Sequence, residues 1–252
     1  MDLSPATLPS LPGWEPGVHV HDRVSHPVHR RGTGPGVVVV HEIPGPTPAV
    51  VAFAEEVVEA GFTVVLPHLF GELGRAPSPG YVAGSLARVC VSREMTAFAT
   101  GVTTPVADWL RSLARDLHAE VGGPGVGALG MCFTGGFALA MMVDESVTAP
   151  VLCQPSAPFP VGRRRAADLN LSPDDLERVV ARVDAGCPVL GVRYRSDPAV
   201  GTRFDTLRER LGDGFRAVEL EGRGHSTVTE QRSQTAVDEV LRFLRERLHP
   251  AD

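Results

Sequence analysis

The sequence predicts an α/β fold in which a mostly parallel central sheet is covered by helices on both faces. Short apolar runs rich in β-branched residues alternate with helix-forming segments along the chain. These runs carry few polar residues, which is typical of parallel strands buried on both faces. Side chains that perform chemistry are therefore expected on loops at the carboxyl ends of the strands.

Length and composition restrict the class of protein further. The 252 residues are 43% hydrophobic and 21% charged, which suits one globular domain spanning residues 1–252. A net charge of −6 argues against nucleic acid or an anionic membrane as a partner. No apolar run reaches the ~20 residues that span a bilayer, and the N-terminal segment lacks the basic and apolar regions of a signal peptide. We expect a cytoplasmic monomer or homodimer.

The cysteines show neither a metal-binding nor a disulfide pattern. None of them lies in a C-x-x-C pair, so we expect no bound metal and no disulfide framework. A free thiol is compatible with a reducing compartment. The cysteines are Cys90, Cys132, Cys153 and Cys187.

The first half of the chain begins with a proline-rich segment, residues 1–17, expected to be an irregular leader. The strands expected after it are residues 18–24, 36–41 and 62–66, and the helices are residues 47–60 and 93–117. Residues 68–91 are rich in glycine and proline, so they predict a long loop, and such loops often act as lids.

The second half continues the alternation. Residues 154–170 are expected to be irregular, and Ser172 followed by Pro173 is a typical helix start. The expected strands are residues 147–153, 188–194 and 215–220, and the later helices are residues 199–211 and 233–248.

Residues 126–142 form the most informative stretch. An uncharged apolar run ends in Gly130-Met131-Cys132, and an alanine-rich, helix-forming segment follows at once. This pattern predicts a strand that turns sharply into a helix and carries a nucleophile, Cys132, on the turn. The backbone N–H of Phe133 would then lie at a helix N-terminus, where unpaired donors stabilise negative charge.

A second pattern overlaps this stretch. Residues 125–130 match the dinucleotide-binding pattern G-x-G-x-x-G, which should follow a strand and open a helix. Here the match is itself the predicted strand, and residues 119–124 before it are a poor strand. We therefore expect no nucleotide and no other cofactor.

Two further groups follow Cys132 at predicted strand ends. Asp197 lies after the strand 188–194, and His225 lies in a glycine-flanked loop before the last helix. Nucleophile, acid and histidine in this order match the α/β-hydrolase triad. The histidine would take the proton of the thiol, and the carboxylate would orient the imidazole.

These motifs resemble the dienelactone hydrolase family, which are α/β-hydrolases with a cysteine nucleophile. The resemblance runs from about residue 37 to the end of the chain and rests on Gly130-Met131-Cys132, Asp197-Pro198, Gly224-His225-Ser226 and the strand ending in Glu42-Ile43. It implies that Glu42 contacts the resting cysteine and controls its ionisation. It also implies that the N–H groups of Ile43 and Phe133 form the oxyanion hole.

Two departures from the family pattern affect the expected site. The family's turn carries glycine where this chain has Thr134, and a β-branched residue there is expected to crowd the turn. Members that cleave dienelactone bind its carboxylate with an arginine where this chain has Thr229. A hydroxyl does not replace an arginine in such a pair, so dienelactone itself is doubtful as a substrate. Arg88 and Arg93 are candidates for the second substrate-binding arginine.

The sequence therefore predicts a cofactor-free hydrolase that cleaves a small ester or lactone through Cys132, His225 and Asp197. Two alternatives remain open. The chain could be a non-catalytic ligand-binding or regulatory protein on the same scaffold, because fold does not determine function. It could also be a thioesterase or an acyltransferase.

Overall fold

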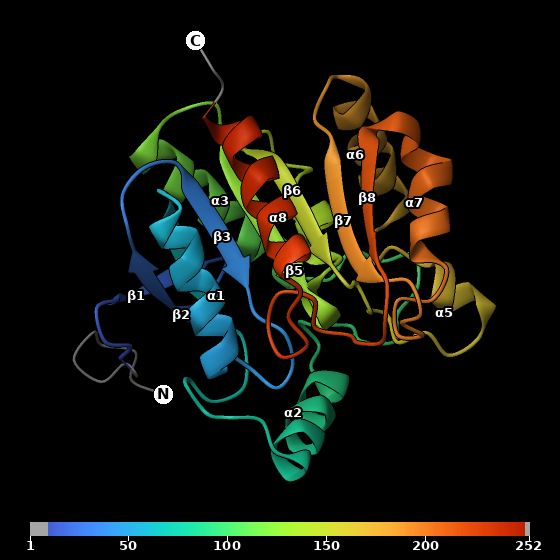
Figure 1. The fold of residues 1–252 in the computed structure, drawn as a ribbon, viewed down its shortest axis with the longest axis horizontal. Coiled ribbons are helices and arrows are strands. Elements are labelled where there is room, and N and C mark those ends of the chain that lie inside the picture. Colours follow the sequence, from blue (N-terminus) through green and yellow to red (C-terminus); the bar gives the residue numbers. More distant parts are fainter. Residues whose placement is uncertain (1–9, 250–252) are drawn as a thin grey trace.

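In the computed structural model, residues 10–249 are described, and residues 1–9 of the expected leader lie outside this range. Eight strands form one sheet in the order β1-β2-β4-β3-β5-β6-β7-β8 (Figure 1). Strand β2 is antiparallel to β1 and β4, and all other neighbours are parallel, which confirms the predicted sheet. The strands are β1 Glu15–His21, β2 Val24–Arg31, β3 Gly36–Val40, β4 Thr63–Pro67, β5 Val126–Met131, β6 Val147–Cys153, β7 Val189–Tyr194 and β8 Phe215–Leu220.

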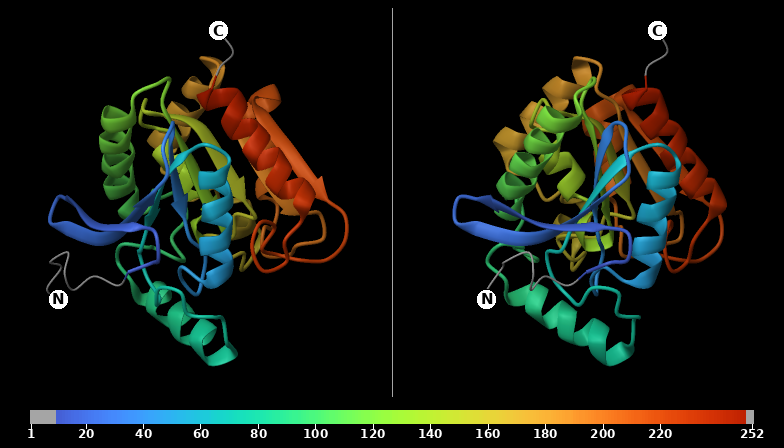
Figure 2. Two further views of the ribbon diagram at one scale, coloured as in Figure 1. Left: turned by 60° about the vertical axis from the view of Figure 1, so that its left-hand side comes forward. Right: turned by 90° about the vertical axis from the view of Figure 1, so that its left-hand side faces the viewer.

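Helices cover both faces of this sheet (Figures 1 and 2). Helices α1 and α8 pack on one face, while α3, α4, α6 and α7 contribute to the core on the other. The helices are α1 Pro48–Glu59, α2 Pro79–Val91, α3 Val106–Val121, α4 Phe137–Met141, α5 Arg163–Ala167, α6 Pro173–Asp184, α7 Arg203–Leu211 and α8 Gln234–Leu248, with 3₁₀ turns η2 Cys132–Thr134 and η3 Gly212–Gly214. None of them, within the described part of the chain, has the length and hydrophobicity needed to cross a bilayer.

The buried strands explain how the sequence specifies two cores. All five residues of β3 are buried, and successive side chains of a strand point to opposite faces. Val38 and Val40 accordingly join the core beneath α3, while Val37 and Val39 join the core beneath α1 and α8. A continuous apolar run is therefore required, because both faces of this strand exclude water.

The N-terminal region differs from the prediction. A hairpin replaces the expected single strand 18–24, and its first strand begins at Glu15, within the expected leader. Asp22 and Arg23 form the turn with φ of +45° and +68°. Positive φ at both central residues is the geometry that matches the twist of a two-residue hairpin.

The region between β4 and β5 also differs. Residues 68–91 are not entirely a loop, because α2 occupies 79–91 and is capped by Ser78, whose hydroxyl accepts from Tyr81 N. Helix α2 projects from the body of the molecule below the carboxyl ends of the strands (Figures 1 and 2). The predicted helix 93–117 begins only at Val106, after Pro105, and extends to Val121.

Smaller differences occur in the second half. The short helix α5 lies within residues 154–170, which were expected to be irregular. Helix α7 begins at Arg203 rather than at residue 199. The predicted start of α6 is confirmed, since the Ser172 hydroxyl accepts from Asp175 N and Pro173 occupies the first turn.

Candidate active site

Cys132 lies on a sharp turn between β5 and the 3₁₀ turn η2. Its φ is +54°, a left-handed conformation that non-glycine residues rarely adopt and that is common at functional sites. The turn needs glycine at two positions, because a Cβ on Gly130 would come within 2.1 Å of Thr134 O and one on Gly135 within 2.6 Å of Pro155 Cα. The predicted strand–turn–helix is thus present, with Cys132 at its apex.

Thr134 does not crowd this turn, so that expectation is wrong. Its side chain is fully buried, and its hydroxyl accepts a hydrogen bond from Met131 N at 3.1 Å. The same hydroxyl lies 3.0 Å from Met131 O and 3.1 Å from the carbonyl oxygens of Val40 and His41 at the end of β3, so the three carbonyls share its one proton. Thr134 therefore ties the cysteine turn to the segment that carries Glu42.

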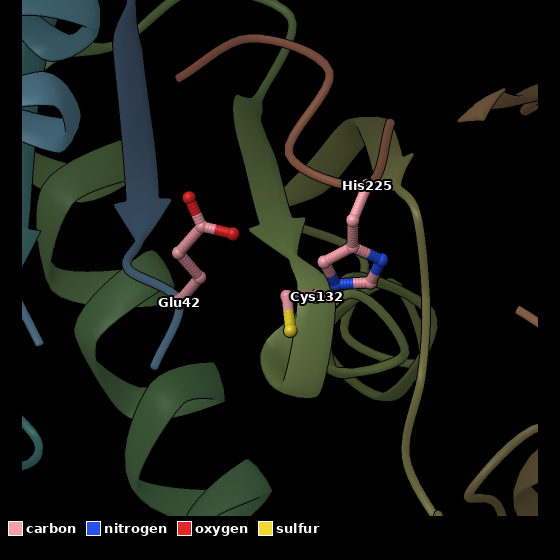
Figure 3. A group of neighbouring side chains, drawn as sticks. All are labelled: Glu42, Cys132 and His225. Carbon is pink, nitrogen blue, oxygen red and sulfur yellow. The ribbon is translucent and has the colours of Figure 1, made fainter. Parts of the chain in front are cut away.

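His225 and Asp197 form the second part of the site. The Nδ1 atom of His225 lies 2.7 Å from Asp197 Oδ2, and Asp197 Oδ1 accepts from Ala199 N at 2.9 Å. Because an ionised carboxylate only accepts, Nδ1 carries the proton and Nε2 faces Cys132 (Figure 3). Burial alone would lower the pKa of His225, but the hydrogen bonds and charges of Asp197 and Cys132 outweigh it and raise that pKa above its ordinary value.

Glu42 follows the end of β3, and its side chain is a neighbour of Cys132 and His225 (Figure 3). One donor atom each of Glu42, Cys132 and His225 lies within 4.8 Å of the others. Glu42 is only 2% exposed, and it accepts hydrogen bonds from the hydroxyls of Ser226, at 2.8 Å, and Thr229. Burial raises the pKa of Glu42, and the two hydroxyls oppose that shift.

Sequence reasoning missed three hydroxyl groups at this site. Ser156 Oγ lies 3.4 Å from Cys132 Sγ, and Ser156 N donates to Cys132 O at 2.9 Å. The hydroxyls of Ser226 and Thr229 donate hydrogen bonds to Glu42. Thr229, which stands where the family has its arginine, is therefore bonded to a carboxylate of the protein itself. Ser156 could have been found by its position just after β6, at the carboxyl edge of the sheet.

The remaining predicted residues lie at different places. Ile43 directly follows Glu42, and Phe133 follows Cys132 within η2. Arg88 and Arg93 are both exposed, on α2 and just after it. Arg88 lines a surface pocket with Glu72 and Arg75, and no residue of the Cys132 cluster lines that pocket. The substrate-binding role of the two arginines stays a prediction.

Solved structures with the same fold were found by comparison. A dienelactone hydrolase from Anabaena variabilis is 17% identical with a TM-score of 0.65, covering 93% of this chain and 98% of its own. A cold-adapted esterase from an Arctic intertidal metagenomic library is 16% identical with a TM-score of 0.59, covering 92% and 94%. A dienelactone hydrolase-like promiscuous phosphotriesterase from metagenomic libraries is 17% identical with a TM-score of 0.61, covering 93% and 98%.

At these identities the neighbours establish the α/β-hydrolase fold alone. No curated protein sequence matched this chain. The sequence profile of the dienelactone hydrolase family matches residues 23–237, which include every residue of the site described above. The chain therefore belongs to the dienelactone hydrolase family.

Proposed function

We propose that this protein hydrolyses a small ester or lactone with Cys132 as nucleophile, His225 as general base and acid, and Asp197 as the group that orients His225. The observation that supports this most is the convergence of three side chains from separate strand ends. Cys132 stands on a strained turn, and the imidazole beside it is held in one tautomer by Asp197. This is the arrangement by which a base activates a nucleophile.

In the first half of the reaction, the thiol proton passes to His225 Nε2 and Sγ attacks the acyl carbon. The tetrahedral intermediate collapses to a thioester on Cys132, and the imidazolium gives its proton to the leaving alkoxide. In the second half, His225 takes a proton from water, whose oxygen attacks the thioester. The acid product leaves, and Cys132 recovers its proton.

The oxyanion of the tetrahedral intermediate would be held by the backbone N–H groups of Ile43 and Phe133. Thr134 supports this assignment because its hydroxyl joins the turn before Phe133 to the carbonyl of His41, two residues before Ile43. Two preorganised donors at such a position stabilise charge that develops only in the transition state.

Glu42 and Thr229 favour an uncharged acyl group over dienelactone. The buried Thr229 hydroxyl is bound to Glu42, so this position offers a substrate carboxylate no cation. A buried carboxylate without an arginine partner would repel a second carboxylate. Neutral esters and lactones are therefore the proposed substrate class.

The test compares wild type with Cys132→Ala on neutral esters, lactones and thioesters, measured by acid release. We expect turnover of neutral substrates by wild type and none by the variant. Cys187→Ala is the control and should behave as wild type, because this thiol lies beside Thr148 O at the amino end of β6, the end opposite to the site. Equal turnover by wild type and Cys132→Ala would refute the thiol mechanism, and a preference for thioesters would favour a thioesterase.

A further inference from the structure

The cluster of Glu42, Cys132 and His225 brings together three different kinds of metal ligand. A carboxylate oxygen, a thiol sulfur and an imidazole nitrogen lie within 4.8 Å of one another (Figure 3). Among residues 10–249, it is the one group of three His, Cys, Asp or Glu side chains whose ligand atoms lie this close together. The residues come from the ends of β3 and β5 and from the loop before α8, so no sequence spacing indicates them.

The chemistry of these donors selects one class of ion. Zn²⁺ takes Cys, His and carboxylate ligands in tetrahedral sites, with ligand bonds of about 2.0–2.3 Å. Mg²⁺ and Ca²⁺ prefer oxygen alone, so a thiol and an imidazole disfavour them. The three donor atoms lie within 4.8 Å of one another, and the ligand atoms of a tetrahedron with such bonds lie roughly 3.3–3.8 Å apart, so zinc binding requires the three side chains to draw closer.

The surroundings of the three donors match those of zinc ligands. Histidine ligands usually donate their second N–H to a carboxylate, a backbone carbonyl or water, and His225 Nδ1 donates to Asp197. Ligating carboxylates are usually hydrogen-bonded as well, and Glu42 is held by the Ser226 and Thr229 hydroxyls. Each oxygen of Glu42 keeps a free lone pair, because each accepts one of these two hydrogen bonds.

We infer that this site binds one Zn²⁺ through Cys132 Sγ, His225 Nε2 and one oxygen of Glu42, with water as the fourth ligand. The metal displaces to solvent the proton that the thiol and imidazole share. Zinc is thereby a reversible inhibitor of the reaction, since it occupies both nucleophile and base; this consequence rests on the proposed function. It blocks the thiol reaction, because Cys132 and His225 are then both ligands of the metal.

The experiment measures zinc binding without relying on turnover. Full-length protein, prepared with a chelator, is titrated with Zn²⁺ by calorimetry, and alkylation of Cys132 by iodoacetamide is followed by mass spectrometry. We expect one Zn²⁺ per chain and slower alkylation of Cys132, restored by chelator, with no effect of Mg²⁺. Glu42→Ala should weaken binding about tenfold or more, and Asp197→Asn should weaken it about 10- to 100-fold. Cys90→Ser, on α2, should bind as wild type.

The outcomes separate this inference from the proposed function. Unchanged alkylation of wild-type Cys132 in saturating Zn²⁺ would overturn the zinc site, and this measurement needs no variant to fold. Equal affinity of wild type and Cys132→Ser would overturn it as well. Zinc protection of Cys132 in a protein that hydrolyses no ester would support the zinc site and contradict the hydrolase. Hydrolysis that saturating Zn²⁺ leaves unchanged would overturn the inhibitor role and leave the hydrolase intact.

Discussion

Replacement of Thr134 by valine tests how the cysteine turn is held. Valine keeps nearly the same shape but has no hydroxyl. The buried Met131 N–H would lose its acceptor, and the carbonyl oxygens of Val40, His41 and Met131 would lose the one hydroxyl donor that they share. An unsatisfied buried polar group costs about 1–3 kcal/mol, so leaving one donor and one acceptor without partners should cost about 2–6 kcal/mol.

The measurement is the thermal midpoint of unfolding, with Thr134→Ser as the matched control. For a chain of this size, the expected cost corresponds to a fall of roughly 4–24 °C in the unfolding midpoint of Thr134→Val. Serine keeps the hydroxyl and loses a methyl group, which should cost about 1 kcal/mol. If Thr134→Val unfolded at the wild-type temperature, or if Thr134→Gly were more stable than wild type, the hydroxyl would not hold this turn.

Three other substitutions test separate parts of the structure. Asp197→Asn should lower kcat about 10³- to 10⁴-fold in ester hydrolysis, because the imidazole loses its orienting carboxylate, and a loss under tenfold would contradict the triad. Arg203 is 1% exposed and donates to backbone carbonyls of the loops after β6 and β7. Arg203→Met should therefore cost about 3–5 kcal/mol in urea unfolding, and a cost below ~1 kcal/mol would refute this role. Burial alone would raise the pKa of Glu219, but Arg193 and Arg208 outweigh it and lower that pKa. The stabilisation is present above the ordinary glutamate pKa and disappears as pH falls below it, so the thermal midpoint should fall more steeply from pH 6 to pH 3 in wild type than in Glu219→Gln.

The sheet could be predicted from the sequence because its strands are buried on both faces. A run such as Gly36–Val40 has no polar residue, and this restricts it to the centre of a covered sheet. The order of Cys132, Asp197 and His225 at successive strand ends then predicted which side chains converge. In the structure His225 Nδ1 lies 2.7 Å from Asp197 Oδ2, and the catalytic roles of the three residues stay a prediction.

Helix α2 could not be predicted from periodicity. Gly80 and Gly84 lower its intrinsic helix propensity, Pro77 lies just before it and Pro79 is its first residue. Its buried face is narrow, formed by Tyr81, Ser85 and Val89. The predicted start of α3, at residue 93, was too early. Apolar periodicity does not define where a helix begins, whereas Pro105, directly before Val106, marks the observed start.

The roles of Ser226, Thr229 and Thr134 could not be predicted, because they depend on partners far away in the sequence. Ser226 and Thr229 bind Glu42 across 184 and 187 residues of chain. From the sequence alone, Thr229 indicates only that the family arginine is absent. In the structure, its hydroxyl donates a hydrogen bond to the buried carboxylate of Glu42. Thr134 was likewise expected to crowd a turn that its hydroxyl in fact joins to β3.

The most direct test of the proposed mechanism is to detect the acyl-enzyme on Cys132. Wild-type protein is mixed with an activated acetate ester, quenched in acid during turnover and digested for mass spectrometry. We expect an acetyl group on the peptide that carries Cys132 in wild type, and slower acetylation of Cys132 in His225→Ala, in which the thiol lacks its base. Turnover without acetylation of Cys132 in either protein, or acetylation confined to another residue, would contradict the thiol mechanism.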